Sequence, residues 1–172
     1  MRGFYLESNQ RWLQLGEVER ALLSSLIGQV VQLLKLEGAS TNPLDFLSDL
    51  NKKATRPQDE VVFRLLPDAY LEDEEGNNDF RKFTEQSLRD EKLAAADFLL
   101  SALPPSDDPV AIKESEVDTW LKALNDVRLA LGTRLEITEG SVTIDESDEE
   151  KNGLLDVYDW LTWLQGTLLE AY

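Results

Sequence analysis

The sequence predicts a mostly α fold, namely a single-domain helical bundle over residues 1–172 with one or two short β-hairpins. Three observations carry this prediction. Apolar residues recur at helical spacing through several long segments. Two pairs of short β-prone runs flank turn-prone positions. The chain has 172 residues, of which 42% are hydrophobic and 30% charged, and this is the length and composition of one folded domain.

An N-terminal hairpin is predicted over residues 4–15. The segments 4–7 and 11–15 are aromatic and apolar, and Ser8, Asn9 and Gln10 between them favour a turn. An isolated two-stranded hairpin is barely stable in water, so this one is expected to pack against a helix.

The first helix is predicted over residues 17–36, with acidic residues at its start, Lys35 near its end and Gly38 just beyond it. Apolar side chains form two adjacent stripes along it. One stripe is Val18, Leu22, Leu26, Val30 and Leu33, and the other is Leu23, Ile27, Val31 and Leu34. Two stripes would bury more than half of the helix, so it is expected to be the central one.

Two short helices are predicted next, over residues 44–50 and 57–66, with a polar linker between them. Pro67 ends the second, because the residue before a proline disfavours helical backbone.

Residues 72–78 are predicted to form an exposed acidic loop, from which Asn77 or Asn78 caps a long helix. The proline-rich segment 104–109 breaks this helix. Its apolar residues are Phe80, Phe83, Leu88, Ala94, Phe98 and Ala102.

Residues 115–118 have the form of a capping box and predict a helix that ends at Gly132. Its predicted buried residues are Trp120, Leu121, Leu124, Val127 and Leu131. A second small hairpin is predicted from residues 135–138 and 141–144, which alternate around Glu139 and Gly140.

A second acidic loop, residues 145–152, is predicted to precede a final helix over residues 154–171. Val157, Leu161, Leu164 and Leu168 share one face of that helix, with Trp160 and Trp163 beside them. Tryptophans at helical spacing usually belong to the core, but one of these two indoles could instead lie at the surface and anchor a partner.

The formal net charge is −17, from 34 acidic and 17 basic residues, and the basic residues are scattered. Such a surface repels phosphates and anionic lipids, so no direct nucleic-acid or membrane partner is expected. The charge could attract a basic protein or serve solubility alone. The sequence has neither a long apolar span nor the apolar core of a signal peptide, so the expected compartment is the cytoplasm.

Histidine and cysteine, which most often carry acid–base and nucleophilic catalysis, are both absent. No glycine pattern for phosphate binding occurs, and the acidic segments lack the spacing of a calcium-binding loop. No cofactor, metal ion or catalytic residue is therefore expected. A protein-interaction module is favoured, and two alternatives stay open: a carboxylate- or metal-dependent enzyme, and a structural homo-oligomeric assembly protein.

Polar and aromatic residues interrupt the apolar stripes of the last two helices and form the candidate site. They are Asn125, Asp126, Arg128, Arg134, Tyr158, Asp159 and Trp160. The favoured interpretation is a network of salt bridges and hydrogen bonds between helices, because buried polar groups must be paired. The alternative is a surface that contacts a protein partner.

Four segments together resemble a known family. They are LLPDAY at residues 65–70, FRKFTE at 80–85 followed by Leu88 and Arg89, WLKALNDVRLALGTRL at 120–135, and VYDWLTWLQ at 157–165. These segments resemble an actinobacterial family of helical proteins of unknown function that includes the oxidative stress regulator AosR.

The resemblance implies a cytoplasmic regulator of transcription or stress response that acts through a protein partner such as a sigma factor. It also implies that the oxidative-stress member senses oxidation through a pair of cysteines. This chain has no cysteine, so direct thiol sensing is not expected here. The family offers no catalytic residues to transfer.

Overall fold

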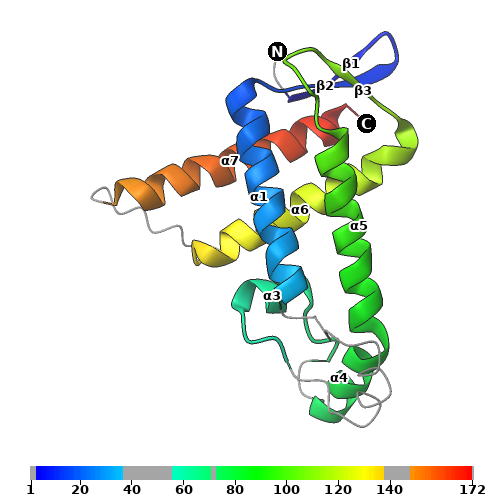
Figure 1. Cartoon of the computed structure of the whole chain (residues 1–172), viewed down its shortest axis with the longest axis vertical. Coiled ribbons are helices and arrows are strands. Elements are labelled where there is room, and N and C mark those ends of the chain that lie inside the picture. Colours follow the sequence, from blue (N-terminus) through cyan, green and yellow to red (C-terminus); the bar gives the residue numbers. More distant parts are fainter. Residues whose placement is uncertain (1–2, 37–55, 71–72, 138–147, 172) are drawn as a thin grey trace.

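The computed structural model describes residues 3–36, 56–70, 73–137 and 148–171. Helix α6 (Val117–Arg134) is its central element, because it packs against α1 (Glu17–Leu36), α3 (Glu60–Leu65), α5 (Gln86–Ala102) and α7 (Glu149–Glu170). Figure 1 shows α1 and α5 side by side, with α6 and α7 crossing them and the sheet at one end. The mostly α prediction is confirmed.

The expectation that the helix over residues 17–36 is central was wrong. Its bounds are confirmed, but α1 buries five residues whereas α6 buries nine. The second predicted stripe of α1 is buried throughout, while Val18 of the first stripe is 79% exposed. The helix therefore uses one face for the core and presents the start of its other stripe to solvent.

The predicted N-terminal hairpin is confirmed as antiparallel strands β1 (Gly3–Glu7) and β2 (Gln10–Gln14). Ser8 and Asn9 form its turn with φ of 50° and 63°, the left-handed backbone that a two-residue type I′ turn requires. A third strand, β3 (Val110–Ile112), pairs antiparallel with β2 and was not predicted from the sequence.

The sheet packs on the helices through a line of three aromatic rings. Trp120 of α6 is fully buried and meets Phe4 of β1 and Phe98 of α5 edge-to-face, with ring centroids 5.4 Å and 6.4 Å away. Edge-to-face pairs add to the free energy gained by burying the rings. Thr167 of α7 also accepts a hydrogen bond from the Phe4 backbone N–H at 3.1 Å, so the hairpin is attached to the final helix.

The prediction of an exposed acidic loop over residues 72–78 was wrong. Asp73 accepts a hydrogen bond from the Gly76 N–H and caps helix α4 (Glu74–Phe80), so the acidic residues occupy the first helical turn. Carboxylates are favourable there because the helix dipole is positive at its N-terminus. Asn77 pairs with the backbone of Tyr70 instead of capping a helix.

A π-helical turn, η1 (Arg81–Glu85), joins α4 to α5, and its Glu85 pairs with two buried arginines, Arg81 of the same turn and Arg89 of α5. Glu85 accepts from Arg81 at 2.6 Å and from Arg89 at 2.9 Å. Arg81 also donates to Asp68, and Arg89 donates to the carbonyl of Leu34 in the last turn of α1. This group, hereafter the Arg81–Glu85–Arg89 network, joins α1, α5 and the segment that follows α3.

Helix α6 begins and ends differently from the prediction. Ser115 forms no capping box; a short 3-10 turn, η2 (Glu114–Glu116), precedes the helix, and Glu116 accepts from the Lys113 N–H. Gly132 does not end it, because α6 continues to Arg134.

A Schellman motif closes α6. Glu136 has φ 56°, its N–H donates to Thr133, and the Ile137 N–H donates to Gly132. Residues 135–137 are thus a helix end and not the strand of the predicted second hairpin, whose remaining residues lie outside the described ones. The short helix predicted over residues 44–50 lies outside them too.

Helix α7 begins at Glu149, earlier than the predicted start at 154, because Asp148 caps it by accepting from the Lys151 N–H. The described part of the second acidic loop, from Asp148 on, is therefore a helix start. The predicted core residues Leu161, Leu164 and Leu168 are buried. In the described part of the chain no helix combines the length and apolarity that a membrane span requires.

Candidate interaction surface

The seven predicted site residues do not form one network. Asp126 is buried and faces α5, where its carboxylate lies 2.7 Å from Lys92 Nζ. Burial raises the pKa of Asp126, and the ammonium of Lys92 only partly opposes this. This pair is an ionic contact within the helix packing.

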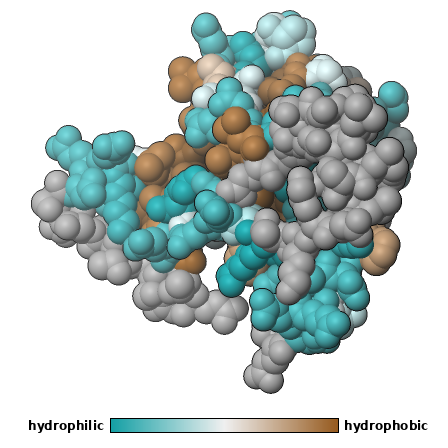
Figure 2. Space-filling view, turned by 60° about the horizontal axis from the view of Figure 1, so that its bottom comes forward, coloured by the Kyte–Doolittle hydropathy of each residue, from teal (hydrophilic) through white to brown (hydrophobic). Residues whose placement is uncertain are grey.

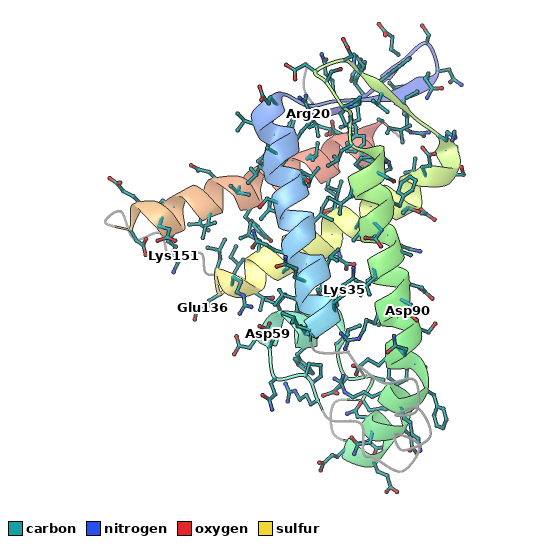
Figure 3. The ribbon with its side chains drawn as sticks, viewed as in Figure 1. Arg20, Lys35, Asp59, Asp90, Glu136 and Lys151 are labelled. Carbon is teal, nitrogen blue, oxygen red and sulfur yellow. The ribbon has the colours of Figure 1, made fainter. Side chains whose placement is uncertain are left out.

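Arg134 lies at the other end of α6 and pairs with α3. Its Nη2 is 2.7 Å from Asp59, which also caps α3 by accepting from the N–H groups of Val61 and Val62. Burial favours the neutral acid, but these hydrogen bonds and the charge of Arg134 outweigh it, so the pKa of Asp59 lies below its usual value. Figure 3 shows Asp59 near Glu136, where α3 starts and α6 ends.

Arg128 and Tyr158 line a groove between α3, α6 and α7 with a volume of about 800 Å³. Its lining, among the described residues, is Glu60, Arg64, Arg128, Leu129, Gly132, Thr133, Glu136, Ile137 and Tyr158. Gly132 allows Tyr158 to pack closely here, because an added Cβ would stand 3.1 Å from Tyr158 Cε2 and the ring would have to shift slightly. We call this feature the α3–α6–α7 groove.

The charge of the α3–α6–α7 groove is balanced. Arg64 and Arg128 face Glu60 and Glu136, with Leu129 and Ile137 among the apolar members. Arg128 donates to Asn125 at 3.4 Å, and its Nε has no hydrogen-bond partner among the described residues. Figure 2 shows hydrophobic side chains in a hollow beside the arm in which α7 begins. Mixed polarity of this kind suits the surface of another protein.

Only part of this groove was predicted from the sequence. Glu60 and Arg64 come from α3, far away in sequence, and the contact between α3 and α6 brings them to Arg128. Their helical spacing of four residues was the only available signal. A second pocket of about 70 Å³, between α1, α3 and α6, is mostly apolar.

The last two predicted site residues, Asp159 and Trp160, lie on different sides of α7. Asp159 is exposed, whereas Trp160 packs partly buried against the core with no hydrogen-bond partner for its Nε1 among the described residues. The indole at the surface is Trp163, which is 45% exposed. Within the described ranges no three histidine, cysteine, aspartate or glutamate side chains are grouped to hold a metal ion.

The fold and the groove thus define an acidic helical protein with a small antiparallel sheet and a groove of mixed charge between three helices. The chain belongs to the family described as Domain of unknown function (DUF2017), whose model matches residues 1–172.

Mycobacterial proteins are similar to this chain over most of its length. A protein of Mycobacterium leprae is 36% identical over 170 residues, which cover 89% of this chain and 78% of that protein. The oxidative stress regulators AosR of Mycobacterium bovis and Mycobacterium tuberculosis are 33% identical over 168 residues, covering 88% of this chain and 77% of each relative. These relatives confirm the resemblance found in the sequence. No solved structure matches the chain.

Proposed function

We propose that this protein regulates a stress response by binding a protein partner in the α3–α6–α7 groove. The observation that carries the proposal is the groove itself, in a chain similar to proteins named oxidative stress regulators. The apolar side chains of its lining would supply the free energy of binding, and the charged side chains would select the partner.

The groove supports binding more than catalysis. Its carboxylates, Glu60 and Glu136, lie among two arginines, and the buried carboxyl with the raised pKa, Asp126, lines neither the groove nor the smaller pocket. Active sites usually combine a pocket with perturbed acids or bases, and here the two are separate. We therefore propose a non-enzymatic role.

The partner we propose is a sigma factor of the transcription machinery, and the compartment is the cytoplasm. The net charge of −17 supports action on a protein and opposes direct DNA binding. Because the sequence contains no cysteine, the proposed regulation uses no thiol of this chain.

Crosslinking mass spectrometry of the tagged full chain in lysate of the producing cell tests this proposal. Wild type should capture a sigma factor crosslinked near α3 and the end of α6. Arg64→Glu reverses one charge of the groove lining and should weaken capture. Lys122→Glu makes the same change at an exposed position of α6 outside the groove and should not.

Three results would overturn the proposal. They are capture of no specific protein, equal loss of capture with Arg64→Glu and Lys122→Glu, and a gel shift of DNA by the chain at physiological salt. A concentration-dependent dimer in light scattering that buries the groove would favour the homo-oligomeric alternative.

A further inference from the structure

A second surface, separate from the groove, lies along α7. It contains an exposed indole and exposed carboxylates that follow one another three or four residues apart, as residues on one helical face do. Its members are Asp156, Asp159, Trp163, Gly166, Leu169 and Glu170. We call this surface the α7 outer face.

The structure holds Trp163 in place while leaving it accessible. Gly3 of β1 lies against the indole, and an added Cβ there would stand 2.8 Å from Trp163 Cη2. One turn further along α7, Thr167 accepts a hydrogen bond from the Phe4 N–H and fixes the strand to the helix. Even so, Trp163 is 45% exposed. An aromatic side chain fixed in this way loses little entropy when it binds a partner.

The carboxylates beside Trp163 are unpaired within the part of the chain that the structure describes. Asp156, Asp159 and Glu170 are exposed and make no ion pair or hydrogen bond with any described residue. Lys151 is the only basic residue of α7, and it lies in the first turn. The exposed charges of α7 around the indole are therefore negative, and Arg11 of β2 meets the helix only at its end, where it donates to the Ala171 carbonyl.

We propose that the α7 outer face binds an arginine-bearing basic segment of a protein partner, with one guanidinium stacked on Trp163 and paired with Asp159. A guanidinium stacks on an indole and pairs with a carboxylate through its planar fork, and lysine can do only part of this. The proposal rests on the proposed function only in assuming that the partner is a protein.

A second copy of the chain is a poor occupant for this surface. A two-fold dimer would bring the same patch of each copy together and would place its carboxylates against the carboxylates of the other copy. Juxtaposed like charges oppose such contacts. Charge complementarity therefore selects a basic partner.

Fluorescence anisotropy with a labelled peptide of alternating arginine and leucine tests the proposal on the full chain. Trp163→Ala should weaken peptide binding about tenfold, and Trp163→Phe should retain most of it. The double variant Asp156→Asn with Asp159→Asn should weaken binding about threefold at low salt. Peptides with lysine or glutamine in place of arginine should bind successively more weakly.

Matched controls distinguish peptide binding at the α7 outer face from attraction of the peptide to the acidic protein as a whole. Phe83→Ala removes another exposed aromatic side chain, and Glu91→Gln with Asp97→Asn removes two exposed charges from α5. These variants should bind the arginine peptide as wild type does. Circular dichroism and urea unfolding of every variant confirm that the fold is retained.

The inference fails if the controls weaken binding as much as the α7 variants do, or if the glutamine peptide binds as well as the arginine peptide. It also fails if light scattering shows a dimer that Trp163→Ala abolishes. Arg64→Glu should leave peptide binding unchanged, so the two proposals can fail separately. If the wild-type chain captures no sigma factor but binds the arginine peptide, the groove proposal fails, and if it captures a sigma factor but does not bind the peptide, the α7 proposal fails.

Discussion

Replacing Glu85 by alanine should destabilise the protein by about 3 kcal/mol, because it leaves a buried guanidinium without a carboxylate. Arg81 and Arg89 are only 4% and 3% exposed, and Glu85 accepts a hydrogen bond from each. Without Glu85, Arg81 still pairs with Asp68. Arg89 keeps, among its described partners, only the backbone carbonyl of Leu34.

The magnitude follows from this difference between the two arginines. Breaking a buried ion pair costs about 3–5 kcal/mol when one charge is left uncompensated. One such charge is created here, and the Leu34 carbonyl partly compensates it, which places the estimate at the lower end. Folded domains are stable by about 5–15 kcal/mol, so the variant should lose a large part of its stability.

Urea unfolding followed by far-UV circular dichroism measures this effect. Glu91→Ala, at an exposed position of the same helix, is the control and should change the free energy of unfolding by less than about 0.5 kcal/mol. Adding Arg89→Met to Glu85→Ala removes the unpaired charge and should cost much less than Arg89→Met costs in wild type. Equal costs in the two backgrounds, or a Glu85→Ala effect no larger than the control, would refute the reasoning.

Three further predictions concern the helices. Glu136→Gly should raise the free energy of unfolding by about 0.5–1 kcal/mol, because glycine adopts the φ of 56° without strain; a loss of stability in urea melts would contradict this. Gly28→Ala should stabilise α1 by about 0.5–1 kcal/mol, since nothing lies within 4 Å of the added methyl group, whereas Gly132→Ala should gain less, because its Cβ meets Tyr158 at 3.1 Å. The pKa of Asp126 is raised in the folded state, so its contribution to stability is present below the ordinary value of 3.8 and is lost as the pH rises through the raised pKa. The free energy of unfolding of wild type should therefore rise relative to that of Asp126→Asn as the pH falls. A difference between the two that does not depend on pH would show that Asp126 has an ordinary pKa.

The sequence correctly predicted the elements in which apolar residues recur at regular spacing. Helix α1, the body of α6 and the buried face of α7 each carry an apolar stripe, and the N-terminal hairpin has β-prone runs on both sides of a turn. Strand β3 has only three residues and no pattern of its own. It exists because the free edge of β2 offers it hydrogen bonds.

Acidic runs produced the main errors in the predicted elements. Because residues 72–78 and 145–152 are rich in acids, both segments were predicted to be exposed loops. Instead, Asp73 caps α4 and Asp148 caps α7, and the acids that follow occupy the first turns of these helices. The favourable interaction of carboxylates with a helix N-terminus outweighed the preference of a charged run for a loop.

The candidate site was only partly predictable because neighbours along a helix point in different directions, about 100° apart per residue. Asp126 faces α5, Arg128 lines the groove and Arg134 meets α3, although all three lie within one segment of the sequence. Only the packing of the other helices around α6 decides which of them reaches a partner.

The attachment of the hairpin to the final helix also determines when the protein can complete its fold during synthesis. Phe4 and Thr167 are separated by 163 residues, which a ribosome adds at about 5–20 residues per second, so the hairpin waits about 8–33 s for α7. The helices that pack before α7 can already be assembling in that interval, while β1, including Phe4, has not yet met α7. A nascent chain of this protein is therefore most exposed to aggregation and to chaperone binding at its first strands, and its C-terminal helix ends that exposure.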